Sequence, residues 1–170
     1  MRALVGLTGR RASGKTTIAL QLKSTYGYAH ASFGDFVRLE AKRRGLPQDT
    51  SSLQTLGDDL IDQLGWEKLC RDVLGNATNA EIAVVDGIRH KAALSSLRAI
   101  AFPGRFVLVF IDIDNRIGAA RLVQRSRIGD ESADEMTTEL EDLRRNADLI
   151  VDGASDGASA TIAAWITQHM

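Results

Sequence analysis

One segment near the start of the chain constrains the fold more than any other. Residues 9–16 read Gly-Arg-Arg-Ala-Ser-Gly-Lys-Thr, which matches the pattern G-x-x-x-x-G-K-[S/T]. They follow the apolar run 3–7 and precede a helical stretch at 16–26. Glycines permit a tight loop whose backbone N–H groups point inward, and the N-terminal end of the following helix adds positive potential. The segment therefore predicts a strand, a phosphate-binding loop and a helix, in that order.

The residue types in this loop suit a nucleotide polyphosphate. Lys15 supplies a full positive charge for the β- and γ-phosphates, and the Thr16 hydroxyl is an oxygen ligand for Mg²⁺. We therefore expect ATP and Mg²⁺ as ligands, against the plainer alternative of a glycine turn with a surface lysine. The expected nucleotide-binding residues are Gly9, Ala12, Ser13, Gly14, Lys15, Thr16 and Thr17.

Apolar runs and helical stretches alternate along the rest of the chain. Such alternation is typical of right-handed β-α-β units, so we predict an α/β, three-layer P-loop NTPase fold. Its five-stranded parallel sheet would carry helices on both faces, and ligands would bind beyond the carboxyl ends of the strands. The expected strands are 3–7, 28–33, 81–87, 105–113 and 148–153.

Composition limits the class of partners. The 170 residues include 21 basic and 22 acidic side chains, so a general nucleic-acid-binding surface is not expected. The single cysteine, Cys70, cannot form an internal disulfide, which favours a reducing compartment. No apolar run is long enough to span a membrane, and the apolar run at the start of the chain is too short for a signal peptide. We therefore expect a cytoplasmic protein that does not bind membranes, with an oligomeric state that the sequence does not predict.

Two further motifs follow the second and third expected strands: GDFVR at 34–38 and DGIR at 86–89. They resemble the G-D-x-x-R and D-G-F-P-R motifs of the nucleoside monophosphate kinase family, which comprises adenylate kinase and its relatives. The segment that begins at 34 is similar also to a small group of archaeal adenylate-kinase-like nucleotide kinases. The resemblance implies ATP-dependent phosphoryl transfer to a nucleoside or deoxynucleoside monophosphate, a small-molecule nucleotide acceptor.

The resemblance also implies roles for individual residues. Arg38 and Arg89 would contact the phosphate of the acceptor, and Asp86 would hold Mg²⁺ through a water molecule. Asp35 would either orient the acceptor or cap the helix that follows it, and the sequence favours neither role. Arginine suits these positions because its planar guanidinium binds phosphate bidentately.

The same resemblance divides the chain, which we expect to be a single P-loop kinase domain over 1–170. An acceptor-binding insertion would span about 34–75 and a short lid about 121–134. Arg121, Arg125 and Arg127 lie in the lid segment, and Arg121 and Arg125 would bring positive charge to the transferred group. A solvated end of a helix is the alternative for these arginines.

Recognition of the acceptor base is less well defined. The adenine-binding glutamine that follows D-G-F-P-R in adenylate kinases has no counterpart in HKAAL at 90–94. Gln54, in the capping-box pattern SSLQ at 51–54, is expected to cap a helix rather than to contact a base.

Two other functions stay open. Dephospho-coenzyme A kinases share the GLTG…SGK[S/T] start, and an alcohol acceptor would require a general base, for which Asp35 is the candidate. A nucleotide-controlled switch or partner-binding ATPase is the other reading, because P-loop folds serve many roles.

Overall fold

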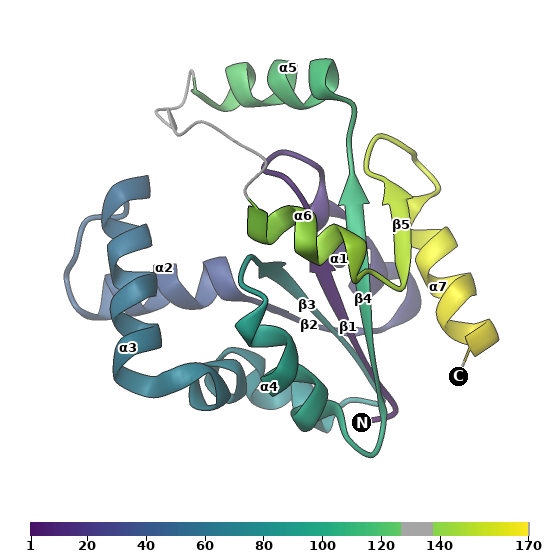
Figure 1. Ribbon diagram of the computed structural model, residues 1–170, viewed down its shortest axis with the longest axis horizontal. Helices are drawn as coiled ribbons and strands as arrows, with labels where there is room; N and C mark the ends of the chain where they lie inside the picture. Colours follow the sequence, from purple (N-terminus) through teal and green to yellow (C-terminus); the bar gives the residue numbers. More distant parts are fainter. Residues whose placement is uncertain (127–137, 170) are drawn as a thin grey trace.

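The computed structural model describes residues 1–126 and 138–169. Five parallel strands form one sheet in the order β2-β3-β1-β4-β5 (Figure 1). This arrangement confirms the predicted parallel sheet. The strands are β1 (Ala3–Thr8), β2 (Ala29–Ser32), β3 (Ile82–Ile88), β4 (Arg105–Asp112) and β5 (Leu149–Asp152).

Helices cover both faces of the sheet, as the alternating pattern predicts. On one face α1 and α7 pack against the strands through buried side chains such as Ile18 and Ile162. On the other face α2, α3, α4 and α6 pack against a second cluster that includes Leu60, Leu97 and Leu143. The helices are α1 (Lys15–Tyr26), α2 (Phe33–Arg43), α3 (Thr50–Leu74), α4 (Ala92–Ala101), α5 (Asn115–Ser126), α6 (Thr138–Arg145) and α7 (Ala158–His169), with a 3₁₀ segment at Gly75–Asn79.

The start of α3 corrects one expectation. Asp49 is the N-cap residue: its carboxylate accepts hydrogen bonds from the Ser52 N–H at 3.0 Å and from the Ser52 hydroxyl at 2.7 Å. Gln54 therefore lies one turn inside the helix, and its predicted capping role is wrong. The helix is interrupted at Gly65, because this glycine has φ 70° and ψ 164° between two helical halves.

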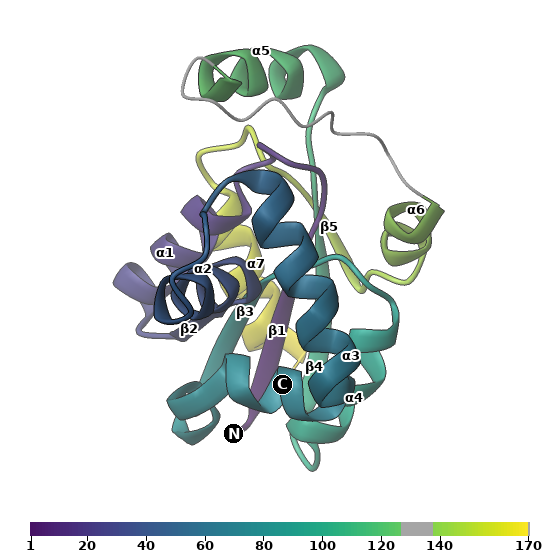
Figure 2. The same cartoon turned by 90° about the vertical axis from the view of Figure 1, so that its left-hand side faces the viewer.

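Because all five strands run the same way, their carboxyl ends meet at one edge of the sheet. The phosphate-binding loop follows β1, the DGIR motif spans the end of β3, and α2 begins directly after β2. The two views in Figures 1 and 2 show α5 beyond this edge, standing away from the sheet.

Two other expectations concern the lid and membrane-spanning segments. Residues 127–134 of the predicted lid, Arg127 included, lie outside the described residues. In the described ranges, no helix has both the length and the apolar character that crossing a bilayer requires.

Candidate active site

The loop after β1 is shaped by close approaches of backbone to backbone. Gly9 has φ 138°, and a side chain there would collide with the carbonyl of Ile111 on β4. Likewise, a side chain at Gly153, just after β5, would overlap the carbonyl of Ser13. Gly14 adopts φ 95° and precedes the first turn of α1. These contacts hold the loop against two neighbouring strand ends, so that the N-terminus of α1 faces the sheet edge.

Ala12 is an exception within this loop. It has φ 58°, the left-handed conformation, although it carries a Cβ atom. That conformation costs an alanine roughly 1–2 kcal/mol relative to the right-handed one. The loop therefore holds a strained residue at the predicted phosphate site, a pattern that recurs at binding sites.

Lys15 lies over the loop from which it comes. Its Nζ donates to the carbonyl of Gly9 at 2.7 Å, to the carbonyl of Arg10, and to the hydroxyl of Ser13 at 3.3 Å. The ammonium group is thus held at the mouth of the loop, where backbone N–H groups and the start of α1 also concentrate positive potential.

Asp86 lies at the end of β3 and is almost fully buried, with 2% of its surface exposed. Burial raises the pKa of its carboxyl, but hydrogen bonds with His30, Ser32 and Thr16 outweigh that effect. The pKa consequently lies below its ordinary value, and the group is ionised at neutral pH. A buried carboxylate beside the Thr16 hydroxyl offers hard oxygen ligands, which fit Mg²⁺.

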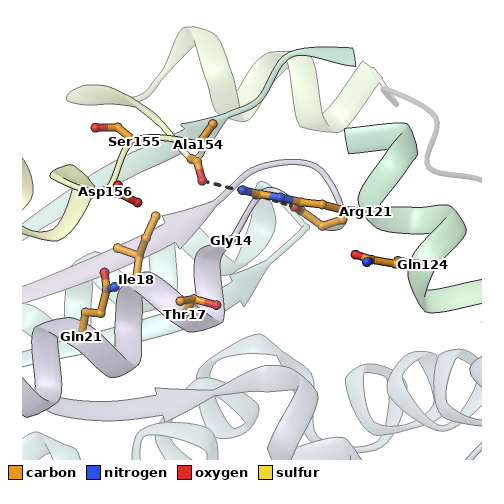
Figure 3. A pocket seen from close by; sticks show the side chains of 11 residues that line it. Gly14, Thr17, Ile18, Gln21, Arg121, Gln124, Ala154, Ser155 and Asp156 are labelled. Carbon is orange, nitrogen blue, oxygen red and sulfur yellow. Dashed lines mark hydrogen bonds between the residues drawn. The ribbon is translucent and has the colours of Figure 1, made fainter. Parts of the chain in front are cut away.

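A first pocket of about 460 Å³ opens on one side of the loop (Figure 3). Arg121 crosses from α5 to this pocket, and its Nη1 donates to the carbonyls of Ala12 and Gly153, both at 3.3 Å. The structure thus joins Arg121 to the loop, and its expected contribution of charge to the transferred group stays a prediction. For Arg125 only its position in α5 is described. The lining residues are Ala12, Gly14, Thr17, Ile18, Gln21, Arg121, Gln124, Gly153, Ala154, Ser155 and Asp156.

A second pocket, of about 290 Å³, brings together arginines from three separate segments. Arg38 comes from α2, Arg89 follows β3, and Arg11 belongs to the phosphate-binding loop itself. The sequence motifs predict the first two, whereas Arg11 occupies a variable position of its motif and was missed. The apolar part of the wall comes mainly from α2 and α3: Phe33, Val37, Leu53, Ile61, Trp66, Leu69, Ile88 and Ala93.

The conformation of Arg38 depends on its neighbours in α2. Its Nη2 donates to Oδ1 of Asp35 at 2.7 Å, and a Cβ at Gly34 would lie only 3.3 Å from the same Nη2. The guanidinium therefore lies across the glycine. Ser32 caps the helix, because its hydroxyl accepts the Asp35 N–H at 3.3 Å. Of the roles expected for Asp35, capping by its side chain is thus wrong, and its carboxylate contacts Arg38.

His30 is a second residue that sequence reasoning missed. Its contact with Asp86 depends on the pairing of β2 with β3, where Ser32 lies opposite Asp86. A lone histidine in a short strand carries no signal of such a contact, and only the register reveals it.

Comparisons with known proteins agree with this architecture. Residues 8–153 match the AAA domain family. A UPF0200 protein of Methanothrix thermoacetophila is 31% identical over 144 residues, which cover 85% of this chain and 76% of that protein. A candidate kinase from Chloroflexus aurantiacus superposes with a TM-score of 0.68 at 18% identity, over 99% of this chain and 98% of the other.

Shikimate kinase from Aquifex aeolicus is a second structural neighbour. It superposes with a TM-score of 0.58 at 20% identity and covers 97% of this chain and 96% of its own. Both matches span nearly the whole chain, so the fold is that of P-loop kinases. The chain belongs to the AAA domain family and to the UPF0200 proteins.

Proposed function

We propose that this protein transfers the γ-phosphoryl group of ATP to the phosphate of a nucleoside or deoxynucleoside monophosphate. One observation carries the proposal: the pocket beside the phosphate-binding loop is lined by Arg11, Arg38 and Arg89 and by an apolar wall. Three cations next to apolar side chains suit a small molecule with a phosphate at one end and a ring at the other.

On the donor side, the loop and Lys15 would bind the β- and γ-phosphates of ATP. Thr16 and Asp86 would hold Mg²⁺, Asp86 through a water molecule, and the ion would neutralise charge on the transferred group. The buried hydrogen bonds to Asp86 keep its carboxylate ionised for this purpose. The first pocket has room for the rest of the donor nucleotide between α1 and residues 153–156.

On the acceptor side, Arg38 and Arg89 would fix the monophosphate so that one of its oxygens faces the γ-phosphorus. Transfer between two anions requires positioning and charge neutralisation rather than a protein nucleophile. Arg121, joined to the loop through Ala12, would add positive charge near the transferred group, and Arg125 would act with it.

The state of Asp35 favours a monophosphate over an alcohol acceptor. An alcohol needs a general base within hydrogen-bonding reach of its hydroxyl. Asp35 instead accepts a hydrogen bond from Arg38 at 2.7 Å and is absent from the lining of the second pocket. Its carboxylate is placed to orient an arginine, which suits an acceptor that brings its own anionic oxygen.

A coupled assay of ADP release tests the proposal across all common nucleoside and deoxynucleoside monophosphates, with dephospho-coenzyme A as the alcohol acceptor. We expect release above the basal rate with at least one monophosphate, and a nucleoside diphosphate as its product. Arg89→Gln should lower that rate by about 100-fold or more, since one charge-stabilising donor is typically worth that much. Arg71→Gln, which removes an arginine paired with Glu67 on the surface of α3, is the matched control. Equal ADP release with every acceptor and with none would overturn the proposal.

A further inference from the structure

The second pocket has a polar wall besides its three arginines. Thr50, Gln54 and Asp58 are spaced four residues apart along α3, so they share one face of the helix, and all three line the pocket. The corrected start of α3 explains this position, because the Asp49 cap leaves Gln54 inside the helix rather than at its end.

Two members of this wall have hydrogen-bonding groups that the protein does not use. Within residues 1–126 and 138–169, neither Gln54 nor Asp58 forms a hydrogen bond or an ion pair with another side chain or with the backbone outside its helix. Asp58 lines the pocket together with three arginines and, within the described residues, forms an ion pair with none of them. Both side chains are exposed, so the polar groups are available to a molecule in the pocket.

Between these two residues the wall is open. Gly57 lines the pocket, and a Cβ atom built there would meet no atom within 4 Å. Leu53 and Ile61 flank the opening along the same helix, and Trp66 lines the pocket beyond Gly65. An open space bordered by aliphatic and aromatic side chains suits a flat ring.

We propose, on the basis of the function proposed above, that Gln54 and Asp58 recognise the base of the acceptor, and that this base carries an exocyclic amino group. A carboxylate only accepts hydrogen bonds, whereas a glutamine amide both donates and accepts. Adenine, cytosine and guanine each present an amino group next to a ring nitrogen, so they offer a donor to Asp58 and a complementary neighbour to Gln54. Uracil and thymine present two carbonyl oxygens around a single N–H, and a carboxylate repels those oxygens.

The test compares kcat/KM for the monophosphates of the five bases in four proteins: the natural chain, Asp58→Asn, Gln54→Leu and Asp59→Asn. Asp59 is the matched control, because it is an exposed aspartate one residue along the same helix and does not line the pocket. The natural chain should prefer an amino-bearing base to uracil and thymine by at least tenfold. Asp58→Asn should reduce that ratio by about 10- to 100-fold, the usual effect of losing a hydrogen bond to a charged group.

Gln54→Leu should lower kcat/KM for the preferred base, while Asp59→Asn should match the natural chain. Calorimetric titration of each monophosphate in the absence of ATP supplies a second readout, and thermal unfolding confirms that each variant is folded. Transfer to monophosphates of all five bases at similar rates, or an unchanged ratio in Asp58→Asn, would overturn this inference and leave the proposed function standing. Transfer to no monophosphate at all would remove both.

Discussion

Nε2 of His30 lies 3.4 Å from Oδ2 of Asp86, and both side chains are more than nine-tenths buried between neighbouring strands. The contact joins β2 to β3 at the edge where the phosphate-binding loop and the DGIR motif meet. It helps to hold a carboxylate, with pKa below its ordinary value, next to Thr16 at the start of α1. The charge of Asp86 at this edge thus depends on a residue outside both sequence motifs.

Replacing His30 should expose this dependence. His30→Leu leaves the buried Asp86 carboxylate with one partner fewer, and we expect unfolding free energy to fall by about 1–3 kcal/mol. His30→Gln, which restores an N–H donor, should recover part of that loss. Urea denaturation of the three proteins measures the effect, and equal stability of His30→Leu and the natural chain would show that the contact contributes nothing.

A glycine substitution usually lowers the unfolding free energy, but at Ala12 we expect it to raise it. Because Ala12 has φ 58°, Ala12→Gly should raise the unfolding free energy by up to about 1 kcal/mol through relief of backbone strain. Ala99→Gly, at an exposed position inside α4, is the matched control and should lower it by about 1 kcal/mol. Thermal or urea unfolding compares the two variants, and a loss of stability in both would contradict the strain at Ala12.

Asp35 separates the two classes of acceptor. If Asp35 orients Arg38 for a monophosphate, Asp35→Asn should raise the KM for the acceptor several-fold and leave kcat within about tenfold, since the amide oxygen still accepts from the guanidinium. A general base for an alcohol would behave differently, because its loss typically costs about 10²–10⁴ in kcat. Steady-state kinetics with the best acceptor decides between them.

Burial of Cys70 makes the free energy of unfolding depend on pH at alkaline values. Desolvation raises the pKa of its thiol from 9.0 to about 11. The unfolded chain therefore ionises at Cys70 near pH 9 while the folded chain stays neutral, so the stabilising effect of the neutral thiol is complete below pH 9 and is lost as pH rises towards 11. Unfolding free energies of the natural chain and Cys70→Ala, measured from pH 7 to 11, should converge over that window.

A thiol reagent provides an independent check on Cys70. At pH 8 we expect slow modification of the folded protein and fast modification in urea, because the reactive thiolate is almost absent while the thiol is buried. Equal rates in both conditions would contradict the burial of this side chain.

Much of the fold follows from patterns that are local in sequence. The glycines and lysine of residues 9–16 predict the loop, and the apolar runs predict all five strands with ends close to those found. The parallel sheet then brings Arg38 and Arg89 to one pocket, although 51 positions separate them in the chain. Here periodicity and strand order carry enough information, because the carboxyl ends of parallel strands share one edge.

Other features of the site could not be predicted because they depend on geometry between segments. Arg11 lines the acceptor pocket through the path of the loop backbone, which the motif leaves unspecified. The partner of His30 depends on the register of β2 against β3. Gln54 does not cap α3 because Asp49, rather than Ser51, is the N-cap residue, and this earlier start leaves Gln54 two positions beyond the place from which a side chain reaches back to the cap.

We propose that two anion-binding sites face each other: the loop and Lys15 bind one anion, and Arg38 and Arg89 bind the second, in a pocket that Arg11 of the loop also lines. Binding of an analogue in which five phosphates bridge two nucleosides tests this arrangement most directly, by calorimetry in the presence of Mg²⁺. We predict that the analogue binds at least tenfold more tightly than ATP, and that Arg89→Gln weakens the analogue by tenfold or more while the affinity for ATP stays within about twofold. An analogue that binds no more tightly than ATP, or an Arg89→Gln variant that weakens both equally, would contradict the account.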